Sequence, residues 1–118
     1  MGYFFDTYAL VEITQKNPNY VSYFDESITT SLLNLIELYY AVLRDSDEDK
    51  AKETYSKFRN SVIPLTDDAI FKAMKLKLKN KRLSYVDCIG YVLALENNLK
   101  FLTGGRQFEG MDNVVFVK

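Results

Sequence analysis

Three carboxylates in this chain lie inside or directly beside apolar runs, where an ionised side chain is unfavourable. Asp6 follows the apolar run 3–5, and Glu37 and Asp87 each lie inside a longer apolar run. Because an unpaired ionised carboxylate is strongly disfavoured in an apolar site, such a group pairs, binds a metal or shifts its pKa. Three carboxylates gathered in space could share one divalent cation, and that is the chemistry this pattern indicates.

Each carboxylate also has a purely structural interpretation. Asp6 could cap a helix that starts after the first strand, and Asp87 could form a capping box with Ser84. Glu37 lies in mid-helix, where capping has no role, and its alternative is an intrahelical pair with Arg44 or with a tyrosine. The nearest cation on that helix, Arg44, lies about two turns further along. The sequence leaves these alternatives open.

The chain has no histidine and a single cysteine, Cys88. This excludes Ser-His and Cys-His nucleophile pairs, a histidine general base, and zinc sites built from histidine or thiolate. Any catalysis must therefore depend on carboxylates, hydroxyls, lysines and hard cations bound by oxygen. A lone cysteine also cannot form an intrachain disulfide, which favours a reducing, cytoplasmic setting.

Composition is typical of a folded α/β domain. The 118 residues are 47% hydrophobic and carry a net charge of -1, so we expect one domain over residues 1–118. No apolar stretch approaches the roughly 20 residues of a membrane span, and the N-terminus lacks signal-peptide features. Six cations are clustered between residues 72 and 82. They form either a phosphate-binding surface or a solvated helix face, and we favour the latter.

The hydrophobic pattern alternates between strands and helices. Short β-branched or apolar runs predict strands at 3–5, 28–30, 62–65, 100–103 and 113–117. Helical spacing predicts helices at 7–15, 19–25, 32–44 and 85–97, a helix opened by the acidic turn 45–49, and another beginning at 66–68. The helix 32–44 is apolar nearly all round, which predicts deep burial.

This alternation predicts a parallel sheet covered by helices on both faces. Ligands of such sheets bind beyond the carboxyl ends of the strands. Asp6 ends the first strand, and Glu37 and Asp87 lie in the early or middle turns of helices. We therefore expect one edge of the sheet to collect all three carboxylates.

Four segments, taken in order, resemble the PIN domain of VapC-type toxins from prokaryotic toxin–antitoxin pairs. They are Phe5-Asp6-Thr7, Ser31 to Glu37, Ser84 to Cys88, and Phe101 to Phe108. The resemblance implies a three-layer α/β/α fold with a five-stranded parallel sheet in the order 3-2-1-4-5. It also implies a Mg²⁺- or Mn²⁺-dependent ribonuclease, a homodimer or higher oligomer, and inhibition by a small antitoxin protein.

The resemblance also assigns roles to residues. It implies that Asp6, Glu37 and Asp87 are the catalytic, metal-binding carboxylates, with Thr7 and Thr103 beside them or beside substrate. The family usually has a fourth acid directly after the Thr-Gly pair, and often another two positions later. Here those positions hold Gly105 and Gln107.

Two functions follow from the resemblance and this departure. The first is a metal-dependent endoribonuclease that hydrolyses RNA phosphodiester bonds, the toxin of a toxin–antitoxin pair. The second is a catalytically impaired PIN domain that binds RNA or protein. A phosphate-handling domain of receiver type ranks last, because the acidic pair expected on its first loop is missing.

Overall fold

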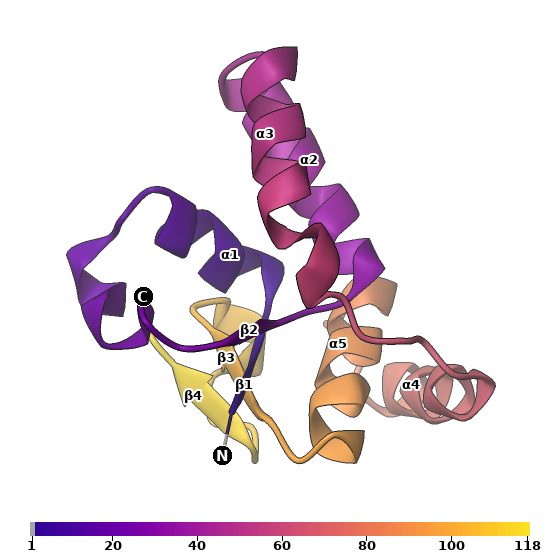
Figure 1. Cartoon of the computed structure of the whole chain (residues 1–118). Coiled ribbons are helices and arrows are strands. Elements are labelled where there is room, and N and C mark those ends of the chain that lie inside the picture. The colour runs from indigo at the N-terminus through magenta and orange to yellow at the C-terminus, as the bar shows by residue number, and fades with distance from the viewer. Residues whose placement is uncertain (1) are drawn as a thin grey trace.

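Four short parallel strands form the central sheet of the computed structural model, which describes residues 2–118. The strands are β1 (Tyr3–Phe5), β2 (Ile28–Thr29), β3 (Lys100–Thr103) and β4 (Val114–Phe116), in the order β2-β1-β3-β4 (Figure 1). In register, Phe4 lies between Thr29 and Phe101, and Phe101 in turn pairs with Val114. The carboxyl ends of β1 and β3 therefore lie side by side.

Five α-helices connect and cover these strands. They are α1 (Thr7–Thr14), α2 (Leu32–Asp45), α3 (Glu48–Phe58), α4 (Asp67–Lys79) and α5 (Tyr85–Glu96). Side-chain caps explain several of the starts: Ser31, Asp47, Thr66 and Ser84 each accept a hydrogen bond from a backbone N–H in the first turn of their helix. The predicted helix 19–25 is instead the 3₁₀ helix Pro18–Tyr23 (η1), which Asn17 caps. The remaining 3₁₀ turns are Arg59–Ser61 (η2) and Arg106–Phe108 (η3).

The alternation of side chains along the strands divides the core into two layers. Phe4 and Phe101, with ring centroids 5.6 Å apart, belong to the cluster that α4 and α5 cover. Phe5 and Leu102 point to the other face and pack in the cluster formed with α1, α2 and α3. The sheet thus lies between two layers of helix, which confirms the predicted α/β/α architecture.

The prediction of a strand at 62–65 is wrong. Only one parallel bridge, between Thr30 and Val62, extends the sheet beyond β2. The bridge is made by the Thr30 N–H to the Ser61 carbonyl and the Ile63 N–H to the Thr30 carbonyl, both 3.0 Å. Pro64 has no N–H to continue the ladder, so pairing stops there. The sheet has four strands rather than five, and the remaining strands keep their predicted order.

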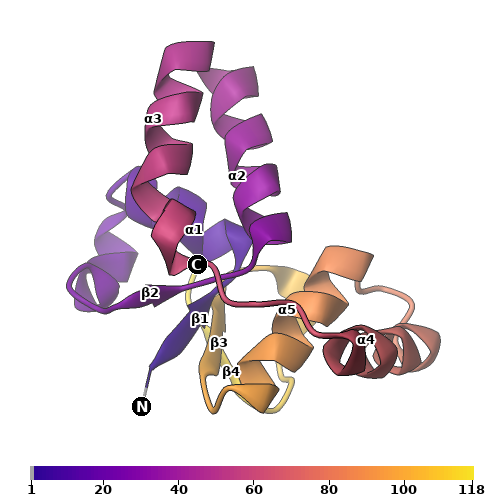
Figure 2. The same ribbon diagram turned by 45° about the vertical axis from the view of Figure 1, so that its right-hand side comes forward.

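The predicted deep burial of the helix 32–44 is also wrong. Of the residues of α2, only Asn34, Leu35 and Leu38 are buried. The helix packs against α3 in a hairpin that stands away from the sheet (Figures 1 and 2). This leaves one stripe of α2 open to solvent, with exposed apolar side chains at Leu32, Ile36, Tyr40 and Leu43. No helix among residues 2–118 has the length and hydropathy needed to cross a membrane.

Candidate active site

The candidate site lies at the carboxyl edge of the sheet, where β1 and β3 end. Asp6 follows β1 directly, and its backbone N–H donates to the Leu102 carbonyl of β3 at 3.1 Å. Thr103 is the last residue of β3. Parallel pairing therefore fixes the positions of Asp6 and Thr103 next to each other, although 97 residues separate them in sequence.

Asp6 is buried, with 5% of its surface exposed, and both of its carboxylate oxygens accept hydrogen bonds. The Thr103 hydroxyl donates to Oδ2 at 2.7 Å, and the Asn34 side-chain amide donates to Oδ1 at 3.2 Å. Asp6 occupies the N-cap position of α1, yet its side chain makes no capping hydrogen bond there among the described residues. Its carboxylate is directed into the site, so capping does not account for this residue.

Burial raises the pKa of Asp6 to about 7, well above the usual value of 3.8. The Thr103 hydrogen bond lowers this pKa, whereas the charges of Asp87 and Glu37 both raise it. Asp87 and Glu37 are thus each close enough to Asp6 for their charges to act on it. A bound cation would relieve both the burial of negative charge and this mutual repulsion.

Glu37 is exposed, contrary to the burial that its apolar neighbours in sequence indicate. Its Oε1 accepts a hydrogen bond of 2.6 Å from the Thr7 hydroxyl, which in turn accepts one of 3.0 Å from Asn34. Arg44 pairs with Asp45 at 2.8 Å rather than with Glu37. The intrahelical pair with Arg44 is therefore wrong, and the Glu37 carboxylate is held toward α1.

Asp87 forms the capping box that the sequence offers as its structural role. The Asp87 N–H donates to Ser84 Oγ at 3.0 Å, and the Ser84 N–H donates to Asp87 Oδ2 at 2.9 Å. The same Oδ2 also accepts a hydrogen bond of 3.1 Å from the side-chain amide of Gln107. The half-buried Asp87 is therefore a helix cap whose charge also acts on Asp6.

Sequence reasoning missed Asn34, the residue that links two parts of the site. Asn34 is fully buried in the first turn of α2, and its amide donates to both Asp6 and Thr7. Its Oδ1 accepts from the Ser31 hydroxyl at 2.6 Å. The available signal was an amide in an otherwise apolar helix, three residues after the capping Ser31.

The donor set suits a hard cation, since it consists of carboxylate oxygens with hydroxyls beside them. Among residues 2–118, however, no three carboxylate or thiol side chains form a compact metal-ligating cluster. Mg²⁺ keeps several waters and commonly binds through one or two carboxylates plus substrate phosphate. Asp6, Glu37 and Asp87 therefore fit a partly hydrated ion, without all three having to contact it.

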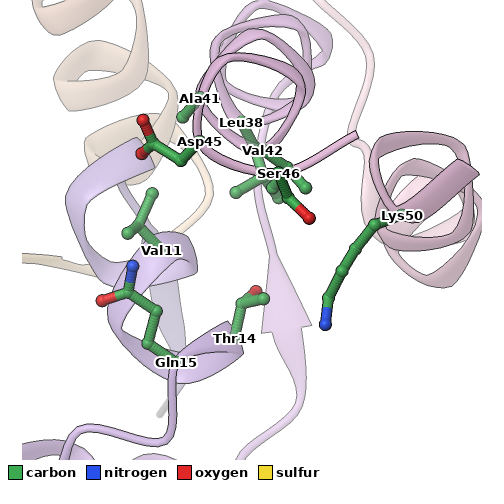
Figure 3. Close-up of a pocket in the computed structure, with 9 residues that line it drawn as sticks. All are labelled: Val11, Thr14, Gln15, Leu38, Ala41, Val42, Asp45, Ser46 and Lys50. Carbon is green, nitrogen blue, oxygen red and sulfur yellow. The ribbon is translucent and has the colours of Figure 1, made fainter. Parts of the chain in front are cut away.

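A separate pocket of about 290 Å³ lies away from these carboxylates. Its walls come from α1, α2 and the start of α3, as Figure 3 shows, with Asp45 and Lys50 among the polar residues around apolar Val11, Leu38 and Val42. None of Asp6, Glu37 and Asp87 lines it. The carboxylate site and this pocket are therefore separate.

Fold and site together define an α/β protein with an acidic site at the carboxyl edge of a parallel sheet. The sequence pattern of the PIN domain family matches residues 3–114. The chain therefore belongs to the PIN domain family, which confirms the resemblance. No curated protein matches the sequence significantly.

Solved structures share the fold over nearly the whole chain. A toxin–antitoxin complex from Klebsiella pneumoniae is 20% identical, with a TM-score of 0.77 and coverage of 97% of this chain and 96% of that one. VapBC2 from Rickettsia felis, bound to a promoter DNA fragment, is 18% identical, with a TM-score of 0.73 over 98% and 97%. Mycobacterium tuberculosis VapC20, a sarcin-ricin loop cleaving toxin, is 12% identical, with a TM-score of 0.72 over 92% of each chain.

Proposed function

We propose that this protein is a metal-dependent endoribonuclease that hydrolyses RNA phosphodiester bonds as the toxin of a toxin–antitoxin pair. One observation carries the proposal. Asp6 is buried at the end of β1, holds hydrogen bonds from Thr103 and Asn34, and has a pKa raised by the charges of Asp87 and Glu37 as well as by burial. A structural carboxylate does not need two further acids beside it.

Asp6, Glu37 and Asp87 are the residues that would hold Mg²⁺ or Mn²⁺. When bound, such an ion supplies positive charge that polarises the scissile phosphate and lowers the pKa of its water. Thr103 and Asn34 orient the Asp6 carboxylate, and Thr7 orients Glu37. Because the chain has no histidine, a carboxylate is the side chain that would accept the proton of the attacking water.

RNA binding is supported by exposed cations on α4 and in the loop that precedes α5. Lys75 and Lys79 on α4 are exposed, as are Lys81 and Arg82 in the loop that leads to Ser84 and α5. Lys77 instead donates to the carbonyls of Lys81 and Leu83, which ties this loop to α4. The loop thus presents positive charge close in sequence to Asp87, where an RNA backbone would pass.

A protein partner is supported by the solved structures and by α2. Two of the similar structures are toxin–antitoxin assemblies. The exposed stripe of Leu32, Ile36, Tyr40 and Leu43 is an apolar surface that an antitoxin or a second copy of this chain could cover. Sedimentation of the purified chain, alone and with the product of a short neighbouring reading frame, separates these two partners.

The test of the nuclease proposal is Asp6→Asn, with Asp25→Asn in an exposed loop as the matched control. We expect the wild type and the control to cleave RNA with Mn²⁺ and to stop in excess chelator. Asp6→Asn should lose cleavage while keeping a native circular dichroism spectrum. Cleavage that persists in Asp6→Asn, or in chelator, would overturn the proposal.

The second candidate is a PIN domain that binds RNA or protein without cutting. It is favoured by the absence of a compact three-carboxylate cluster among residues 2–118 and by Gly105 and Gln107 at positions where acids are expected. RNA binding without cleavage at any Mn²⁺ concentration would support it. Cleavage gained when Gly105→Asp is combined with Gln107→Ala would show that the missing acid limits the natural site.

A further inference from the structure

Both hydrogen bonds to the Asp87 carboxylate within the described chain go to the same oxygen. Oδ2 accepts from the Ser84 N–H at 2.9 Å and from Gln107 Nε2 at 3.1 Å. Ser84 belongs to the start of α5, whereas Gln107 lies in η3, directly beyond β3. Two donors from different elements therefore fix the rotation of this carboxylate, and Oδ1 accepts no hydrogen bond from the described residues.

The absence of a side chain at Gly105 leaves room for the side chain of Gln107. The backbone of Gly105 has φ -71° and ψ 125°, an ordinary extended conformation that any residue adopts. A Cβ at this position would lie 2.9 Å from Gln107 Oε1 and 3.2 Å from its Cδ and Nε2. The space left by Gly105 is thus occupied by the one side chain that reaches Asp87 from this turn.

The neighbouring Gly104 serves as a contrast. A Cβ there would lie 2.4 Å from the Val117 carbonyl oxygen and 2.3 Å from the Tyr8 ring. Backbone packing therefore demands a glycine at position 104. At position 105, by contrast, the three nearest atoms all belong to the flexible side chain of Gln107.

We propose that Gln107 is a positioning residue for Asp87. Its amide holds Oδ2, and this leaves Oδ1 oriented for a cation or its water, while Gly105 supplies the room that Gln107 needs. The role in cation binding rests on the proposed function. A neutral amide suits this role because a carboxylate at position 107 has no N–H to donate and would repel Asp87.

The first experiment measures Mn²⁺ affinity by calorimetry on the full chain. Gln107→Met keeps the length of the side chain and removes the donor, and Gln15→Met on the exposed end of α1 is the matched control. Loss of a residue that orients a metal ligand typically weakens metal binding by about 10- to 100-fold. We expect that loss for Gln107→Met, a lower kcat with an unchanged KM for RNA, and no change for the control. Unchanged Mn²⁺ affinity in Gln107→Met would overturn the proposal.

The second experiment is a double-mutant cycle between positions 105 and 107. Gly105→Ala alone should displace Gln107 and weaken Mn²⁺ binding to a similar degree. In a Gln107→Ala background the same substitution should cause no further loss, because the side chain it displaces is already gone. Independent, additive losses would overturn the link between the two residues.

The third experiment separates this inference from the proposed function. The side-chain amide signals of Gln107 are identified by NMR as those that disappear in the Gln107→Met variant and remain in Gln15→Met. Without metal, both Asp87→Asn and Gly105→Ala should shift these signals. Signals that move in neither variant would overturn the contact even if the protein cleaves RNA. A wild type that binds no Mn²⁺ while the signals do move would overturn the nuclease proposal and leave the contact itself established.

Discussion

Asn34 and Asp6 are joined by a buried hydrogen bond of 3.2 Å from Nδ2 to Oδ1, although 28 residues separate them. This bond links the first turn of α2 to the end of β1. The same amide donates to Thr7, which holds Glu37. One uncharged side chain therefore connects two of the three carboxylates, and its removal should affect both.

Asn34→Ala should destabilise the protein and reduce RNA cleavage. It leaves the buried Oδ1 of Asp6 and the Ser31 hydroxyl without their partner, and an unsatisfied buried polar group costs about 1–3 kcal/mol. Urea unfolding measures this loss, with Asn60→Ala in the exposed turn η2 as the control. An Asn34→Ala variant as stable and active as wild type would show that this bond does not organise the site.

Stability without metal should fall as pH rises from about 4 to about 7. The folded-state pKa of Asp6 is about 7 and its ordinary value is 3.8, so in this range the folded protein binds a proton that the unfolded chain has released. The free energy of unfolding then decreases by up to about 1.4 kcal/mol per pH unit. Thermal unfolding in chelator across this range measures the slope.

Two variants test the origin of that slope. Asp6→Asn has no titrating group at this position, so this component of the pH dependence should disappear. Asp87→Asn removes a charge that raises the pKa of Asp6, so the stability decrease should end at a lower pH. A slope that survives in Asp6→Asn must come from another residue.

Thr103→Val should weaken Mn²⁺ binding at pH 7, with recovery at higher pH. The hydroxyl of this fully buried residue donates to Asp6 and lowers its pKa, so its loss raises that pKa further. The ion must then displace a proton that Asp6 holds more tightly. Calorimetry at two pH values measures the effect, and Thr29→Val on β2 is the control. Equal affinities in Thr103→Val and wild type at pH 7 would contradict this role.

Mn²⁺ should stabilise the folded protein, because it binds carboxylates that only the folded chain brings together. An ion at 100 times its dissociation constant adds about 2.7 kcal/mol. Thermal unfolding with Mn²⁺ and then with chelator measures the gain and its reversal. The gain should disappear in Asp6→Asn and shrink in Glu37→Gln. An equal gain in Asp6→Asn would place the ion elsewhere.

The sequence determined the features that depend on local pattern. Alternating apolar strands and helices specify a parallel sheet covered on both faces, and Ser31 and Ser84 start their helices as their side chains predict. Asp6 stands out because a charge at the end of a buried strand has few structural explanations. These properties arise within a few residues, so the order of residues is enough to reveal them.

Only the tertiary structure decided which side chains meet and which face solvent. Glu37 and the apolar stripe of α2 are exposed because only the face of α2 that carries Leu35 and Leu38 packs into the core, and α3 is the helix's main neighbour. Because Pro64 has no N–H, the segment 62–65 pairs with the sheet through one bridge only. Asn34 and Gln107 reach Asp6 and Asp87 across 28 and 20 residues. Contacts of this kind depend on how distant elements pack against each other, which no local pattern encodes.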